Sequence, residues 1–197
     1  MQDTEFYNEF RKLHPKPHFF FPEISTTDEY IFEKLSPKNF QQLYLLFESD
    51  SSTFVDERFK TYNEAKEYAQ YISVCGAYMP KHGSQDWLLK LKNGDYASII
   101  HLYDLSLETF GQNHKRAWIG FATKESFRKQ NITSKAVTHF INYIFRSYPA
   151  IDFIHAMTNK ENKAAINFLL KCGFLTDGEE RLSKNHAFFI LSRQGLS

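Results

Sequence analysis

The stretch from Ala117 to Ala136 reads Ala-Trp-Ile-Gly-Phe-Ala-Thr-Lys-Glu-Ser-Phe-Arg-Lys-Gln-Asn-Ile-Thr-Ser-Lys-Ala. It predicts a strand, then a short basic loop, then the first turn of a helix. The N-terminus of a helix presents unpaired backbone N–H groups and the positive end of a dipole, so a loop that enters it can wrap its amides around an anion. Arg128 and Lys129 add positive charge to this loop. The order of elements therefore predicts a pocket for a pyrophosphate group.

The bulk composition is that of one globular domain. The chain has 197 residues, of which 42% are hydrophobic and 24% charged, and its formal net charge is +1. A net charge this small gives no overall electrostatic field that would attract nucleic acid or a membrane surface, so any anion site must be local. No apolar run approaches the length of a membrane helix, the N-terminus lacks a signal-peptide core, and Cys75 and Cys172 lie far apart. We expect a cytoplasmic protein with reduced thiols, no metal site and no nucleic-acid or membrane partner.

Two helices are expected after a first strand over Glu29–Leu35. Ser36 and Pro37 are typical of a helix cap and of the first helical residue. Thr61 and Glu64 have the spacing of a capping box, which predicts the start of the second helix. In the sequence, the two helices therefore follow the first strand and precede the other strands.

A hairpin and a third strand lead into the basic loop. Asn93-Gly94 lies between the apolar runs Trp87–Leu91 and Tyr96–Asp104, which is a strong hairpin signal. His114–Thr123 should extend this antiparallel sheet by one strand.

The helix after the basic loop has an unusually regular apolar spacing, which predicts one buried face. Its apolar residues are Val137, Phe140, Ile141, Ile144 and Phe145. Ile151–Met157 is expected to be the next strand, and a strand, a helix and a strand in series predict a crossover between parallel strands. A helix over Asn162–Cys172, closed by Gly173, and a strand over Ala187–Ser192 follow.

These elements predict an α/β (α+β) fold with a mixed, mostly antiparallel central sheet and helices on both faces. We divide the chain into an N-terminal arm, residues 1–23, and a single domain, residues 24–197. The aromatic run Phe19-Phe20-Phe21 in the arm needs cover. Packing on the domain is the interpretation that we favour, and a border of the binding site or a homodimer contact is the alternative.

The basic loop resembles the acyl-CoA loop of the GNAT superfamily of N-acetyltransferases. That loop has Arg or Gln, two residues, Gly, one residue, then Gly or Ala; the pattern falls on Arg128, Asn131 and Thr133, so two glycines are replaced. Ser134-Lys135-Ala136 is similar to the Ser/Thr-Glu-Ala that follows in the ribosomal-protein N-terminal (alanine/serine) acetyltransferase branch. Asn162 to Phe174 resembles that branch's Asn, two residues, Ser, and a helix that ends in Lys-x-Gly-Phe.

The resemblance spans roughly Ile24 to Ser192. It implies a single-domain GNAT-like fold and transfer of an acetyl group from acetyl-CoA to a primary amine, either a protein N-terminus or a small amine. It also implies direct attack in a ternary complex of enzyme, acetyl-CoA and acceptor. No signature in the sequence identifies the acceptor.

The resemblance also assigns a cofactor site. In the family, the strand before the loop splays from its neighbour and its main chain holds the pantetheine arm and the acyl carbonyl; that strand is Trp118–Thr123 here. Asn131 suits the left-handed conformation that a glycine would adopt. Thr133 is a less suitable glycine replacement because its Cβ crowds the pyrophosphate, although its hydroxyl and that of Ser134 could donate to a phosphate oxygen.

Two further cofactor contacts are implied on the last helix. Asn162 would hydrogen-bond the cofactor, cap its own helix, or do both. Lys171 would approach the adenosine phosphates or lie in solvent. The expected cofactor-binding residues are Phe121, Ala122, Thr123, Arg128, Lys129, Gln130, Asn131, Ile132, Thr133, Ser134, Asn162 and Lys171.

The usual proton carriers of the family are replaced in this chain. Trp118 stands at the position of the branch's glutamate, and Ala165 at the position of its serine. Leu169 stands where many members have the tyrosine that protonates the thiolate. The catalytic residues therefore stay open. A histidine in the cleft could accept the amine proton directly or through water, and a surface or packed position is the other interpretation for each candidate. The candidates are His101, Asp104 and His114.

Two other functions stay open. The replaced glycines and proton carriers also suit a CoA-binding, GNAT-like protein with little or no transferase activity. The aromatic arm suits an interaction module, which is the more remote hypothesis.

Overall fold

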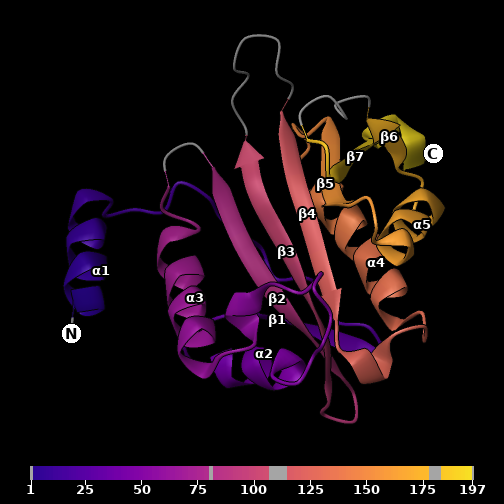
Figure 1. Ribbon diagram of the computed structural model, residues 1–197. Helices are drawn as coiled ribbons and strands as arrows, with labels where there is room; N and C mark the ends of the chain where they lie inside the picture. The colour runs from indigo at the N-terminus through magenta and orange to yellow at the C-terminus, as the bar shows by residue number, and fades with distance from the viewer. Residues whose placement is uncertain (1, 80–81, 107–114, 178–182, 197) are drawn as a thin grey trace.

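One seven-stranded sheet forms the centre of a computed structural model that describes residues 2–79, 82–106, 115–177 and 183–196 (Figure 1). The strand order is β1-β2-β3-β4-β5-β7-β6, and every neighbouring pair is antiparallel except β4 and β5, which run parallel. This confirms the expected mixed, mostly antiparallel sheet. The strands are β1 (Tyr30–Lys34), β2 (Gly83–Leu91), β3 (Tyr96–Ser106), β4 (Arg116–Thr123), β5 (Phe153–Asn159), β6 (Leu175–Asp177) and β7 (His186–Ser192).

Helices cover both faces of the sheet, as expected. α2 and α3 share a core with one face, and α4 and α5 pack on the other. α1 lies beside α3, to one side of the sheet (Figure 1). No helix in the described part of the chain is long and apolar enough to cross a membrane. The helices are α1 (Gln2–Leu13), α2 (Phe40–Phe47), α3 (Tyr62–Cys75), α4 (Ile132–Ser147) and α5 (Lys163–Lys171), with short 3-10 helices at Glu57–Phe59, Glu125–Phe127 and Arg193–Leu196.

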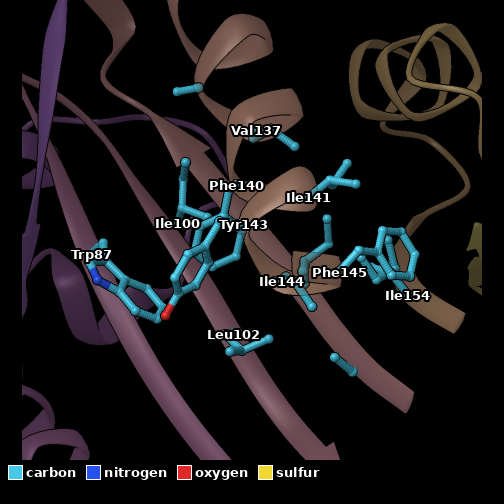
Figure 2. Packing of buried hydrophobic residues seen from close by; sticks show 14 of the residues in the cluster. Trp87, Ile100, Leu102, Val137, Phe140, Ile141, Tyr143, Ile144, Phe145 and Ile154 are labelled. Atoms are coloured by element: carbon cyan, nitrogen blue, oxygen red, sulfur yellow. The ribbon is translucent and has the colours of Figure 1, made fainter. Parts of the chain in front are cut away.

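The predicted apolar face of α4 is the centre of the larger core. All five apolar residues of α4 named above are buried. Figure 2 shows this face packed over the sheet, near Trp87 of β2 and Ile100 and Leu102 of β3. Phe140 meets Trp87 edge to face, with ring centroids 5.0 Å apart. This packing fixes the direction of α4 and thereby the place where its N-terminus meets the sheet.

The expected start of α2 is wrong, because the helix begins at Phe40 and not at Pro37. The reason is the side chain of Asn39. Its Oδ1 accepts a hydrogen bond from the Ser36 amide at 2.8 Å, and its Nδ2 donates to the Lys34 carbonyl at 3.0 Å. These bonds close a turn over residues 36–39, and the helix starts only after that turn.

The start of α3 is where the capping box placed it. Thr61 is the residue before α3, with Tyr62 as the first helical residue. Its hydroxyl donates to the Glu64 carboxylate rather than bonding to a helix amide. The position was therefore predicted correctly, although the reciprocal bonds of a full capping box do not form.

β4 and β5 are the parallel pair that the strand-helix-strand order predicted. Their pairing ends at Ile119 opposite Ala156. Both strands continue beyond this point, β4 to Thr123 against β3 and β5 to Asn159 against β7. The two strands therefore part, and the sheet has a gap in its hydrogen bonding between them.

The end of the N-terminal arm packs on the domain. Phe19 and Phe21 of the arm are buried in the same core as α4. The Tyr143 hydroxyl of α4 donates to the Pro22 carbonyl at 2.9 Å. The boundary that we place after residue 23 stays a prediction.

Replacing Phe140 by alanine should lower the free energy of unfolding by about 3–5 kcal/mol, because it opens a cavity in a close-packed core. Urea unfolding followed by tryptophan fluorescence measures the change. Asn142→Ala, on the exposed side of the same helix, is the matched control and should change the free energy by less than about 0.5 kcal/mol. Equal losses in both variants would contradict the buried face assigned to α4.

Candidate cofactor and acceptor site

The gap between β4 and β5 is the first component of the site. Beyond Ile119, residues 120–123 of β4 pair with β3 on one side only. Backbone polar groups away from water need partners, so this edge suits an extended ligand. Phe121, Ala122 and Thr123 lie along it and line a cavity, where the family resemblance places the pantetheine arm.

Two residues of the loop between β4 and α4 adopt the left-handed backbone conformation. Lys129 and Asn131 have φ angles of 64° and 61°. This is the region that favours glycine and that asparagine tolerates better than most other residues. The left-handed conformation expected for Asn131 is confirmed. Lys129 adopts it as well, which the sequence did not predict.

The amides of this loop are available for a ligand. Within the described ranges, no protein atom accepts a hydrogen bond from the backbone amides of residues 129–134. The first bond at the start of α4 runs from the Lys135 amide to the Asn131 carbonyl at 3.1 Å. Unpartnered amides at a helix N-terminus form a binding site for phosphate. The loop therefore has the geometry expected of a pyrophosphate site.

Not every predicted loop residue points its side chain to the cavity. Gln130 donates from Nε2 to the Ser126 carbonyl at 2.7 Å and so closes the loop on itself. Ile132 packs against the larger core. The Thr133 hydroxyl lies 2.8 Å from that of Thr123, a contact that joins α4 to the end of β4, and Ser134 lines the cavity.

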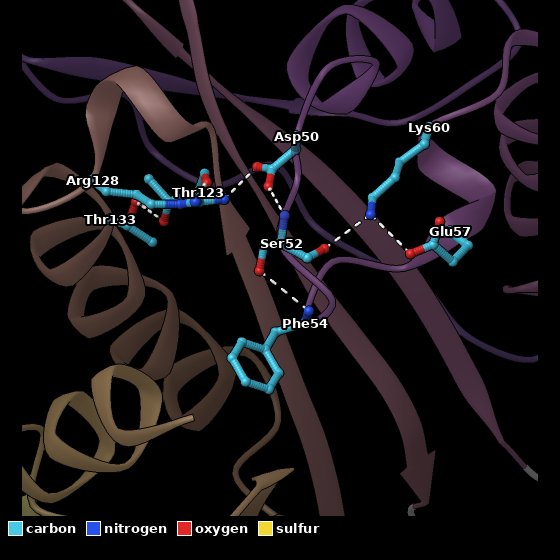
Figure 3. Close-up of polar contacts among 8 residues, drawn as sticks. All are labelled: Asp50, Ser52, Phe54, Glu57, Lys60, Thr123, Arg128 and Thr133. Carbon is cyan, nitrogen blue, oxygen red and sulfur yellow. Dashed lines mark hydrogen bonds and ion pairs between the residues drawn. The ribbon is translucent and has the colours of Figure 1, made fainter. Parts of the chain in front are cut away.

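The Arg128 side chain already has interaction partners within the protein. Its guanidinium forms an ion pair with the Asp50 carboxylate, whose side chain is 2% exposed, and its Nε donates to the Thr123 carbonyl at 3.1 Å (Figure 3). Asp50 also accepts the Ser52 amide at 2.8 Å. Arg128 therefore ties the end of β4 to the segment that follows α2, and its charge is largely balanced by Asp50.

Three lysines supply the positive charge at the cavity instead. Lys129, Lys163 and Lys171 line it, and none of them forms an ion pair with a described residue. Lys163 and Lys171 lie at the two ends of α5. Charges without internal partners are the ones that can attract the phosphates of a ligand.

A cavity of about 660 Å³ joins these parts. β4, the loop and α5 enclose it, and Phe54 and Val55 close it from the segment after α2. Asn162 is the N-cap of α5, because its Oδ1 accepts the Ala165 amide at 3.1 Å. Its capping role is confirmed, and it lines the cavity as well, so its amide nitrogen can still meet a ligand.

A second cavity, of about 760 Å³, lies on the other side of the gap. The two cavities share five lining residues, so they adjoin each other. The remaining wall of the second cavity comes from the segment after α2, from α3, and from β2 to β5, with Leu169 of α5 and His186 of β7. The shared residues are Phe54, Phe121, Ala122, Asn162 and Ala165.

The positions of the usual proton carriers are filled by groups that do not titrate. Trp118 stacks between Tyr103 and His155, with ring centroids 6.1 and 5.1 Å away. Ala165 lies where the two cavities meet, and Leu169 is buried beside the second cavity. Burial first, and the Arg116 charge second, lower the pKa of His155.

The second cavity contains a histidine on a buried carboxylate. His101 of β3 lies opposite Asp86 of β2, and its Nδ1 is 2.9 Å from Asp86 Oδ2. The Tyr68 hydroxyl donates to the same oxygen at 2.6 Å, and burial together with the Asp86 charge raises the pKa of Tyr68 far above its usual range. All three residues line the cavity. Asp86 was missed in the sequence, where the only signal is an acid directly before the apolar run of β2.

Of the other two candidates for the base, Asp104 does not line this cavity. Asp104 forms ion pairs with His82 and with Arg116 at the far end of β3. His114 lies outside the described residues.

Comparisons with known proteins identify the family. The model of the acetyltransferase (GNAT) domain matches residues 30–175. No curated protein sequence matches the chain. The many solved structures that match include RimL, a ribosomal L7/L12 α-N-protein acetyltransferase in complex with coenzyme A. It is 14% identical, with a TM-score of 0.68, over 87% of this chain and 98% of that one.

Two further structures are similar to this chain. RimJ from Mycobacterium smegmatis, in complex with CoA-disulfide, is 15% identical, with a TM-score of 0.67, over 85% of this chain and 83% of that one. The dodecameric spermidine N-acetyltransferase from Vibrio cholerae is 12% identical, with a TM-score of 0.63, over 86% of this chain and 97% of that one. These likenesses support the fold, and the family match supports acetyl transfer from acetyl-CoA to an amine. The chain belongs to the GNAT family of acetyltransferases.

Proposed function

We propose that this enzyme binds acetyl-CoA in the first cavity and a primary amine in the second, and that the amine attacks directly in a ternary complex. The observation that carries this proposal is the gap between β4 and β5, where the two cavities meet. A site of this kind accelerates the reaction mainly because it holds both reactants in line and polarises the carbonyl.

The residues fit the cofactor by charge and by backbone geometry. The amides of residues 129–134 would hold the diphosphate, with Lys129, Lys163 and Lys171 around it. The main chain of Phe121 to Thr123 would hold the pantetheine arm and the acyl carbonyl. When bound, acetyl-CoA supplies the thioester carbon that the amine attacks. A backbone donor aimed at developing negative charge is worth on the order of 3 kcal/mol.

The second cavity favours an amine that carries an apolar or aromatic group. Its walls are aromatic on several sides, and its two carboxylates already have partners among the described residues. Burial opposes the ionisation of Asp56, but the Arg58 guanidinium, with Nη2 at 2.6 Å from Asp56 Oδ2, lowers its pKa. Asp86 is taken by His101 and Tyr68. A polyamine would find no unpaired carboxylate for its second ammonium group. The aromatic residues are Phe54, Phe59, Tyr68, Tyr71, Tyr103 and Phe121.

The alternative function is CoA binding with little or no transfer. It is favoured by one observation, the absence of a titrating group at Trp118, Ala165 and Leu169. We propose the cytoplasm as the compartment, since Cys75 and Cys172 are free thiols. A homodimer contact stays a proposal for the arm.

A panel of amines tests the proposed function. Release of the CoA thiol should be detected with aromatic monoamines or with peptides that have an aromatic N-terminal residue. Their kcat/KM should exceed that of spermidine at least tenfold, because the cavity offers rings and no spare carboxylate. Acetyl-CoA binding without turnover of any amine would instead favour the alternative function.

Replacing Lys129 by glutamate should weaken acetyl-CoA binding at least tenfold, as measured by calorimetry. Lys129 is the better probe of the loop than Arg128, because Arg128→Glu would also put a second carboxylate beside buried Asp50. Lys92→Glu, an exposed lysine in the β2–β3 hairpin, makes the same charge change far from the cavity and should leave the affinity unchanged. If Lys129→Glu bound as well as the wild type, the loop would not be the phosphate site.

Asn131→Gly should bind acetyl-CoA as tightly as the wild type or tighter, because glycine adopts the φ of 61° without steric cost. Asn131→Val should bind about tenfold more weakly, since a β-branched residue there costs about 1–2 kcal/mol or displaces the amides. Calorimetry on the two variants measures the difference. Equal affinities would show that the left-handed turn does not matter for the ligand.

A further inference from the structure

We infer that His101, oriented by buried Asp86, is the group that takes the proton from the acceptor's ammonium. This inference rests on the proposed function and assigns a residue to the base that the family's usual positions lack. Asp86 acts through His101, so it is a positioning residue.

The pair is held by the sheet and by the helix above it. Asp86 and His101 are direct partners in the β2–β3 ladder, and the Asp86 side chain is 2% exposed. The Tyr68 hydroxyl of α3 donates to the oxygen that faces His101. The Phe59 ring stacks on the imidazole, with centroids 5.7 Å apart and an angle of 19° between the planes. The ring of His101 is therefore fixed in position and in plane.

The contact with Asp86 also fixes the tautomer. Since Nδ1 faces a carboxylate, the proton of the neutral imidazole lies on Nδ1 and is donated to Asp86. The lone pair is then on Nε2, the other ring nitrogen. A residue of this kind is a ready general base, because its carboxylate partner stabilises the imidazolium that forms.

The position on the sheet places His101 beside the reacting edge of β4. Its partner in the β3–β4 ladder is Gly120, the first residue after the β4–β5 pairing ends. A Cβ added at Gly120 would lie 3.4 Å from His101 Cδ2, so this strand position is directly beside the ring, and both residues line the second cavity. Phe121 and Ala122 follow directly, where the acyl group is proposed to lie.

His101 removes one of the two protons that the acceptor nitrogen loses in the reaction. Neutral His101 accepts one proton of the ammonium at Nε2, directly or through one water, and passes it to solvent. The freed nitrogen lone pair forms the N–C bond to the acetyl carbon, and the C–S bond breaks with its electron pair on sulfur. The second proton of the nitrogen goes to that sulfur. No oxidant or further reactant is needed.

The test starts with His101→Gln, which keeps the size and polarity of the side chain. Its kcat/KM for the best amine should fall at least about 100-fold, the usual contribution of a general base, while the calorimetric affinity for acetyl-CoA stays within twofold. The matched control is His82→Gln, because His82 also pairs with an aspartate but lies outside both cavities. It should keep wild-type activity. A His101→Gln enzyme within threefold of the wild type would overturn the inference.

The pH profile separates a base from a structural residue. Besides Asp86 and Tyr68, the charged groups near His101 are Asp56 and Arg58 of the segment that carries Phe59. The wild-type kcat/KM should fall toward acid pH as His101 takes a proton, and this limb should be absent in His101→Gln. Asp86→Asn should lower kcat at least tenfold and shift the pH at which kcat/KM falls on the acid side, with acetyl-CoA affinity unchanged. A limb that is identical in all three proteins would overturn the inference.

A measurement on the free protein makes the inference independent of turnover. Two-bond proton–nitrogen NMR correlations of histidine-labelled protein, assigned with His101→Gln, should show His101 with its proton on Nδ1. A proton on Nε2 would leave no lone pair for the acceptor and would overturn the inference. If the wild type acetylated no amine, the proposed function would fail, whereas this spectrum would still decide whether Nε2 can accept a proton.

Discussion

The parting of β4 and β5 is the constraint on which the site depends. The two strands pair only as far as Ile119 and Ala156, and beyond this point each is held from its other side, β4 by β3 and β5 by β7. The outer neighbours therefore fix both strands on either side of the gap. α5 spans it, and its Phe168 meets Phe121 edge to face at 4.6 Å. Because unpaired main chain away from water needs partners, this gap determines where both the cofactor and the acceptor can lie.

Three carboxylates around the gap form internal ion pairs. Asp50 holds Arg128, Asp56 holds Arg58, and Asp86 holds His101. The Asp50 and Asp86 side chains are only 2% exposed, and a buried charge without a partner is costly, so the fold itself requires these two pairs. The pairing of Arg128 has two consequences. The lysines at the cavity are left to attract the phosphates, and the segment after Asp50 is fixed so that Phe54 lies where the two cavities meet.

The sequence predicts what depends on local pattern. The apolar face of α4, the Asn-Gly hairpin, the crossover to β5 and the left-handed Asn131 are all local features, and the structure confirms each. The start of α2 was wrong because one side chain, Asn39, closes a turn that propensity does not reveal. The pair of Asp50 with Arg128 joins two loops far apart in the sequence, and the pair of Asp86 with His101 joins neighbouring strands, so only the tertiary structure shows them. β6 has three residues and little burial, which is too weak a pattern to predict.

The loss of the family's glutamate and the position of His101 form one arrangement. Along β4, Trp118 and Gly120 lie on the same face, opposite Tyr103 and His101 of β3. Trp118 stacks between Tyr103 and His155, so aromatic rings fill the space where a carboxylate would otherwise stand. Two residues further along the strand, Gly120 has no side chain, and it lies beside His101 in the wall of the second cavity. A base at His101 therefore lies one strand over and closer to the end of the β4–β5 ladder, where the acyl group and the amine are proposed to meet.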